Sequence, residues 1–201
     1  MAPVKLPALP SLVRRGRLIL IGLACVLTMA LASANVQADS YDERRVRAGA
    51  RLFRSMLAAD TGLEKRREAD GSLRVWLYAA DPVLGREIST LISPSDPNKA
   101  KLRGMPVRID STASLPADGT AVPAGVFLAS IPDDAELERL VRWSIAHHVI
   151  VYSPFEGHVE RGVAGGLSIE AKVQPYVNLG TLKASGVELK PLFMKVAKVH
   201  P

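Results

Sequence analysis

Short polar side chains follow three apolar segments of this chain, at the places where strands are expected to end. In an open parallel sheet, small ligands bind beyond the carboxyl ends of the strands. Hydroxyl and carboxylate groups at that edge can form hydrogen bonds with a small polar molecule. The sequence therefore predicts a candidate ligand crevice, formed by Asp81, Ser130, Asp133 and Ser153, with Glu156 and His158 as further candidates.

The same residues also have local structural roles available. Asp81 immediately precedes Pro82, as a helix N-cap precedes a proline in the first turn. Asp133 stands three residues before Glu136, which is the spacing of a capping box. Ser153 is followed by a proline, which is typical of a turn. The structural interpretation is the favoured one at these positions, and the ligand crevice is the alternative.

Motifs for other chemistry do not occur in the sequence. The first expected strand-to-helix turn contains no glycine, which argues against a nucleotide site, and there is no phosphate loop. His147 and His148 are adjacent and point in different directions, and His158 has only Glu160 nearby as a second metal ligand. No Gly-x-Ser-x-Gly elbow occurs, so an exported hydrolase has no nucleophile. We expect a binding protein without a cofactor or a metal, and not an enzyme.

The first 38 residues have the layout of a secretory signal peptide. Three arginines within residues 14–17 precede an uncharged, mostly apolar run at 18–34, and Val36-Gln37-Ala38 offers small residues at the −3 and −1 positions. An uncleaved membrane anchor is the alternative, although the apolar run barely reaches the length needed to span a bilayer. Both alternatives predict export, and we expect a periplasmic location. The lone Cys25 lies within the apolar run, so the mature chain would have no disulfide.

The formal net charge of +6 mostly describes the signal segment. Four of the 26 basic residues precede residue 38, which leaves 22 basic against 20 acidic residues. A nearly balanced charge gives no indication of nucleic-acid binding.

Apolar strands alternate with amphipathic helices along residues 39–201. Strands joined by crossover helices predict an α/β domain with a mostly parallel sheet, here a single Rossmann-like domain. The chain is expected to close with a β-hairpin, a short helix from Asn178 to Gly186, and a last helix with Leu192, Phe193, Val196 and Val199 on one face. Strands are expected at 73–78, 106–109, 124–129, 149–152 and 167–173, with a return at 176–177 after a turn at 174–175, and helices at 42–59, 83–92 and after Asp133.

Arginines crowd the outer faces of the expected first helix. Arg47, Arg51 and Arg54 lie on its polar side and could contact an acidic partner. The simpler interpretation is a solvated helix face. These three residues are the candidate partner-binding surface.

The C-terminal third resembles the YfiR-like family of periplasmic proteins. The resemblance lies in the order and spacing of Gly165-Gly166, Val177-Asn178-Leu179, Ala184-Ser185-Gly186-Val187 and Val196-Ala197. It extends over residues 42–199 and is strongest after residue 120. The chain departs from the family in lacking disulfide cysteines and in having Ala58-Ala59-Asp60 where an aromatic-Trp-Pro sequence is common.

The resemblance implies a regulatory function. The best-studied members restrain an inner-membrane diguanylate cyclase by docking on its periplasmic sensor domain. Such docking would shift a membrane protein between two states and so change cyclic di-GMP synthesis inside the cell. We therefore expect a periplasmic regulator of an inner-membrane signalling protein, most of all a diguanylate cyclase. The sequence leaves open whether two copies of this chain form a homodimer. The alternative is a periplasmic small-ligand-binding domain that uses the strand-end crevice.

Overall fold

An eight-stranded mixed sheet organises the part of the chain that follows the expected signal segment. The computed structural model describes residues 41–114 and 121–201, and the predicted signal peptide at 1–38 lies outside those residues. Residues 43–201 form one compact unit. In spatial order the strands are β2 (Lys101–Leu102), β3 (Met105–Thr112), β1 (Leu73–Tyr78), β4 (Gly125–Leu128), β5 (Ile150–Ser153), β6 (Gly165–Ile169), β7 (Val173–Asn178) and β8 (Lys198–His200).

The pairing of the strands confirms the predicted α/β class. Strands β3, β1, β4, β5 and β6 are parallel to one another, whereas β2 runs antiparallel to β3 and β7 runs antiparallel to β6. Strands β4 and β5 are buried at every residue. Strands covered on both faces are expected to be apolar throughout, which explains why these two segments lack alternation.

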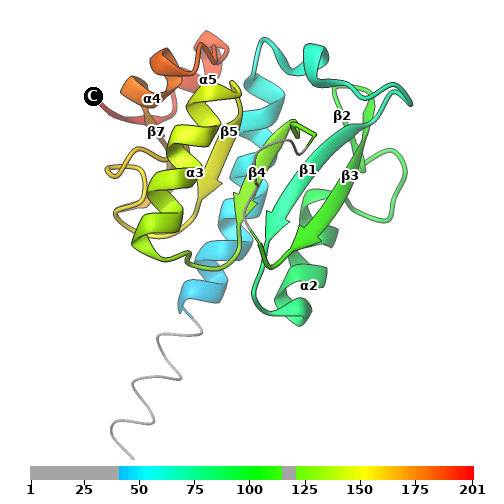
Figure 1. Cartoon of the computed structure of the whole chain (residues 1–201), viewed down its shortest axis with the longest axis horizontal. Coiled ribbons are helices and arrows are strands. Elements are labelled where there is room, and N and C mark those ends of the chain that lie inside the picture. The colour runs from blue at the N-terminus through cyan, green and yellow to red at the C-terminus, as the bar shows by residue number, and fades with distance from the viewer. Residues whose placement is uncertain (1–40, 115–120) are drawn as a thin grey trace, which may run out of the picture. The chain divides into compact units, whose positions relative to one another are not determined.

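Helices cover both faces of the sheet (Figure 1). The helix at 41–59 lies on one face, where the Phe53 ring is 5.4 Å from that of Phe127 and 5.7 Å from that of Tyr152. On the opposite face, Trp143 stacks on Trp76 with ring centroids 5.8 Å apart. The remaining helices are η1 (Leu63–Arg66), α2 (Pro82–Ile92), α3 (Asp134–Ala146), α4 (Leu179–Ala184) and α5 (Pro191–Met194).

The 41–59 helix packs directly against the backbone of the sheet. A Cβ atom at Gly125 would lie 2.8 Å from Leu57 and 3.1 Å from Phe53. Because a side chain at this position would push the helix away, glycine permits the close approach. Within the described ranges, no helix combines the length and apolar character that would let it cross a bilayer.

Helix caps predicted from the sequence are confirmed. The Asp81 side chain accepts a hydrogen bond from the Val83 amide, and Pro82 occupies the first turn of α2. Asp133 and Glu136 form the reciprocal capping box of α3. Asn178 caps α4, and the chain leaves that helix through Gly186 with φ +62°. Local signals of this kind therefore positioned three helices correctly.

The C-terminal hairpin and the last helix differ from the prediction. The turn lies at 170–172, so Gln174 and Pro175 belong to β7 and do not form the turn. The last helix is shorter than predicted: α5 spans the four residues Pro191–Met194 and buries none of them, and Val199 lies in β8 beside Val177. A helical apolar face needs a surface on which to pack. Here Leu192 is 76% exposed and Val196 is 57% exposed, while the open edge of β7 satisfies backbone groups of β8.

Candidate functional site

The structure brings two of the predicted crevice loops together beyond the carboxyl ends of β1 and β4. The Ser130 hydroxyl accepts a hydrogen bond of 2.8 Å from the Ala80 amide. From β1 the chain first continues to β3 on one side of β1 and then crosses to β4 on its other side. The gap between β1 and β4 is therefore a point at which the direction of strand addition reverses. This is the position at which open α/β sheets bind ligands.

Three of the four crevice residues form local hydrogen bonds there. Asp81 Oδ1 accepts from the Val83 amide at 2.8 Å, and Asp133 Oδ1 accepts from the Glu136 amide at 2.7 Å. Ser130 holds the Ala80 amide. These contacts give the crevice residues a structural role at the starts of α2 and α3 and between the two loops.

Ser153 is placed apart from the other crevice candidates. Its side chain is fully buried, and its hydroxyl lies 2.7 Å from Nδ1 of His158. The same hydroxyl accepts a hydrogen bond from the Phe155 amide. Burial, with a smaller effect from Arg161, lowers the pKa of His158. Ser153 therefore stabilises the loop after β5, and its burial leaves it out of reach of a ligand at the surface.

The candidate partner-binding arginines of the 41–59 helix have different surroundings. Arg47 forms an ion pair with Glu87 of α2 at 2.5 Å, and Arg54 donates hydrogen bonds to the carbonyls of Ile92, Lys99 and Lys101. These contacts attach the helix to α2 and to the segment before β2. Arg51 is exposed, and no salt bridge joins it to another residue of the described ranges.

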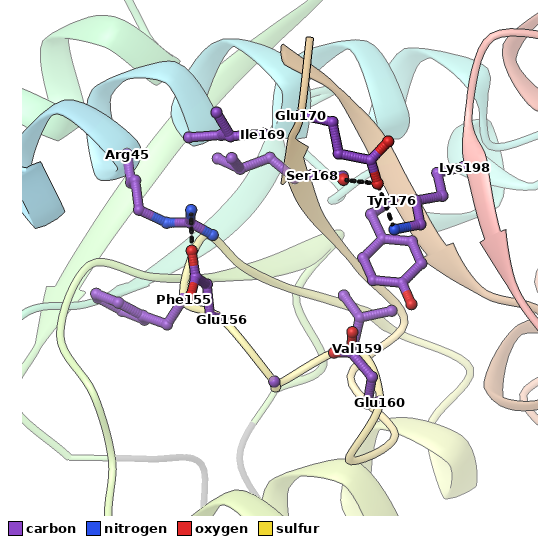
Figure 2. A pocket seen from close by; sticks show the side chains of 12 residues that line it. Arg45, Phe155, Glu156, Val159, Glu160, Ser168, Ile169, Glu170, Tyr176 and Lys198 are labelled. Carbon is purple, nitrogen blue, oxygen red and sulfur yellow. Dashed lines mark hydrogen bonds and ion pairs between the residues drawn. The ribbon is translucent and has the colours of Figure 1, made fainter. Parts of the chain in front are cut away.

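A polar pocket of about 360 Å³ opens beyond the carboxyl ends of β5 and β6 (Figure 2). Its walls come from the 41–59 helix, the loop after β5, and strands β6, β7 and β8. Figure 2 shows the Arg45–Glu156 pair on one side of the space and the Glu170–Lys198 pair with Tyr176 on the other. The twelve lining residues are Arg45, Phe155, Glu156, Gly157, Val159, Glu160, Leu167, Ser168, Ile169, Glu170, Tyr176 and Lys198.

The first side of the pocket rests on a buried guanidinium. Arg45 is 3% exposed, and its Nε donates to the carbonyl oxygen of Pro154 at 3.0 Å. A terminal nitrogen of Arg45 donates to Glu156 at 2.8 Å, although the Glu156 side chain is 75% exposed. The pair connects the first helix to the loop after β5, and it holds one carboxylate at the mouth of the pocket.

The opposite side contains a second ion pair. Lys198 Nζ lies 2.7 Å from Glu170 and 4.9 Å from the centroid of the Tyr176 ring. The hydrogen bond with Lys198 lowers the pKa of Glu170, and the same bond raises the pKa of Lys198. Burial, followed by the hydrogen bond with Glu160, raises the pKa of Tyr176. At neutral pH Glu170 is therefore a carboxylate, Lys198 an ammonium and Tyr176 a neutral phenol.

These residues can bind a ligand, but they form no catalytic pair of a nucleophile and a base at the surface. The Ser153–His158 pair has suitable atoms for such chemistry, yet both side chains are buried. Among the described residues, no group of three or more histidine, cysteine or acidic side chains could hold a metal ion. His147 and His148 use Nδ1 for the carbonyls of Trp143 and Ser185, respectively.

The sequence interpretation identified only part of this pocket. Glu156 is one of the further crevice candidates, whereas Glu170 falls within the strand expected at 167–173 and is not among the candidates. Lys198 was assigned to a helix, and β8 brings it beside Glu170. Glu170 lies in the turn after β6, and no local pattern links it to a lysine 28 residues later.

Comparisons with known proteins give no family. No family model matches the chain, and no curated protein matches it. Among solved structures, it is similar to an ABC domain from Streptococcus pneumonia in complex with L-Trp, with 11% identity and a TM-score of 0.47. It is also similar to a conserved domain protein from Vibrio cholerae O1 biovar eltor, with 9% identity and a TM-score of 0.43.

The alignments cover 72% and 68% of this chain but only 62% and 59% of the Streptococcus and Vibrio chains, respectively. Similarity at this level supports no inference about a ligand.

Proposed function

We propose that this chain is an exported binding domain, without catalytic activity, that holds a small polar ligand in the pocket between Arg45 and Lys198. The supporting observation is the pocket itself. It has a volume of about 360 Å³ and contains two ion pairs that face each other across the space. Pockets for small ligands have volumes of about 300–1,000 Å³ and present a few polar groups that orient the ligand.

The arrangement of apolar and charged side chains fits this function. Phe155, Val159 and Leu167 also line the pocket and supply a surface for the carbon atoms of a ligand. The ion pairs supply hydrogen-bond donors and acceptors at either end. Because Arg45 and Ser168 are buried, they are held by packing before a ligand arrives, which reduces the ordering cost of binding.

A thermal-shift screen of the mature chain against small metabolites tests this proposal. We expect at least one compound to raise the melting temperature, and Ser168→Gln, which lengthens a pocket-lining side chain, to abolish that shift. Ser114→Gln, at an exposed position outside the pocket, is the control. A shift that survives Ser168→Gln but is lost when Asp81 and Ser130 become Ala would move the site to the crevice between β1 and β4.

A second candidate function is docking on a membrane signalling protein. The resemblance to the YfiR-like family suggests it, and the exposure of three apolar side chains near the C-terminus favours a protein contact: Leu192, Val196 and Val199. In this function the domain is periplasmic and modulates an inner-membrane partner, with a diguanylate cyclase as the first candidate. Exposed apolar groups close together are typical of protein-binding surfaces.

In-cell crosslinking of the tagged full-length chain tests the docking function. Capture of one inner-membrane sensor that has a cytoplasmic cyclase domain would support regulation of cyclic di-GMP. Capture should then weaken when Leu192 and Val196 become Ser. Capture of a kinase or receptor would support the docking function but would exclude a diguanylate cyclase as the partner. Capture that persists in the Leu192/Val196 variant would exclude this surface.

A further inference from the structure

The charges around the pocket do not balance. Glu156, Glu160 and Glu170 line it together with only two cations, Arg45 and Lys198. Each cation already forms an ion pair, with Glu156 and Glu170 respectively. No salt bridge joins Glu160 to another residue of the described ranges; burial, followed by the hydrogen bond with Glu160, raises the pKa of Tyr176. The pocket therefore has one carboxylate in excess.

From this excess we infer that the ligand is a small organic cation whose ammonium or guanidinium group binds between Glu160 and Glu170, in place of Lys198. The inference rests on the proposed function of the pocket. An anionic ligand would meet three carboxylates. The two cations that it would need, Arg45 and Lys198, are already paired with Glu156 and Glu170. A cation instead gains Glu160, a carboxylate that forms no salt bridge within the described ranges.

Lys198 marks the position that the cationic group would take. Its ammonium is held by Glu170 and lies over the ring of Tyr176, with 4.9 Å to the ring centroid. A carboxylate beside an aromatic face recognises alkylammonium and guanidinium groups in general. The Lys198 side chain is 41% exposed, so it can swing into solvent when another cation replaces it.

The strand that presents Lys198 is short and largely exposed. Strand β8 has three residues, of which Lys198 and Val199 are exposed, and the preceding α5 buries no residue. The segment packs on the core through Phe193, Met194 and Ala197, so a movement of the exposed Lys198 side chain away from Glu170 leaves that packing in place. By contrast, Arg45 is buried and tied to Pro154, so it remains in place when the ligand binds.

The apolar lining sets the shape of the ligand. Val159 and Leu167 are buried, Ile169 is 41% exposed, and all three line the pocket. These side chains can cover a short alkyl chain. The ligand class is accordingly a short aliphatic amine or guanidine.

Isothermal titration of the mature chain with defined probes tests the inference. The cations are butylamine, putrescine and agmatine, and the matched probes are 1,4-butanediol and succinate. We expect at least one cation to bind and neither matched probe to bind. Glu160→Gln and Glu170→Gln should each weaken that binding by about fivefold, the upper range for an exposed charge pair. Glu138→Gln, which removes an exposed carboxylate on α3, should leave it unchanged.

Lys198→Met provides the sharpest measurement. If the ligand competes with Lys198 for Glu170, this variant should bind the cation several-fold more tightly. A lysine that merely supported the fold would give weaker binding when removed. Weaker or unchanged binding in Lys198→Met overturns the inference, as does the absence of binding by all three cations.

The outcomes for the inference and for the proposed function are distinct. Succinate or a neutral metabolite that binds and is excluded by Ser168→Gln would overturn the cationic class and leave the pocket as a ligand site. If no compound of any charge class stabilises the chain, both the pocket's function and the cationic class fail.

Discussion

The guanidinium of Arg45 and the carboxylate of Glu156 lie 2.8 Å apart, yet one residue is buried and the other is exposed. The two partners therefore differ in what they contribute to stability. Removing the exposed carboxylate leaves Arg45 with the Pro154 carbonyl. Removing the buried guanidinium leaves that carbonyl, and the loop after β5, without their donor.

This asymmetry predicts unequal costs for the two substitutions. We expect Arg45→Met to lower the free energy of unfolding by about 1–3 kcal/mol, the usual cost of an unsatisfied buried group. Glu156→Gln should cost less than about 1 kcal/mol, as surface pairs do. Urea unfolding measures both, with Arg142→Met in an exposed pair of α3 as the control. Equal costs would contradict the structural role of Arg45.

Tyr152 contains a buried hydroxyl for which no partner is found among the described residues. Its ring packs against Phe53 and Phe127, which Phe would preserve. Because an unpaired buried hydroxyl is costly, Tyr152→Phe should be neutral or should raise the free energy of unfolding by about 1 kcal/mol. Urea unfolding measures this, and Tyr152→Leu should be destabilising through loss of ring packing. A large loss in Tyr152→Phe would reveal a hydrogen-bond partner in solution.

The Asp133 carboxylate caps α3, which gives a test of its structural role. Asp133→Ala should lower the free energy of unfolding by about 1 kcal/mol, and Asp133→Asn by less, because Asn also caps helices. Asp134→Ala, one residue further on, keeps the capping box and serves as the control. Thermal unfolding followed by circular dichroism distinguishes them. If Asp133→Ala is harmless, the capping box contributes nothing measurable.

Stability should depend on pH through His158. Burial holds the pKa of His158 below its ordinary value of 6.5. The unfolded chain therefore binds this proton more readily than the folded chain. The contribution to stability is complete above the unfolded pKa and is lost as the pH falls from about 6.5 toward the folded pKa. Arg161 adds to the lowering, whereas Asp134 and Glu160 oppose it.

Urea unfolding at about pH 5 and about pH 8 measures this dependence. His158→Asn, which can keep a hydrogen bond to Ser153, should lose less stability on acidification than the natural chain. His148→Asn is a matched control, because His148 is exposed and its φ of +59° is tolerated by Asn. A natural chain and a His158→Asn variant with the same pH dependence would contradict the role of His158.

The contact between Glu170 and Lys198 should affect the local opening of β8. Glu170→Gln removes the ion pair from a three-residue strand, so amide exchange at Val199 and His200 should accelerate roughly two- to fivefold. Hydrogen exchange measured by mass spectrometry follows this segment. Glu64→Gln, which breaks an exposed pair with Arg103, is the control. Unchanged exchange would show that pairing with β7 alone holds β8.

Much of the fold was predictable because its signals are local. The N-cap residues Asp81, Asp133 and Asn178 act within four residues of themselves, so their order in the chain is enough to locate helix starts. Apolar runs such as β4 and β5 indicate buried strands for the same reason. The prediction failed where a segment had two possible environments. The end of the chain could form an amphipathic helix or an edge strand, and its own sequence favoured the helix.

The sequence by itself determined the α/β class, the order in which the main strands follow one another along the chain, the helix caps, and the nearly balanced charge of residues 39–201. The tertiary structure alone decided that β8 joins β7, and hence that Lys198 meets Glu170 while Arg45 meets Glu156. These pairs are 28 and 111 residues apart. Contacts at such separations depend on which surfaces remain open once the sheet has formed, and no local pattern of residues contains that information.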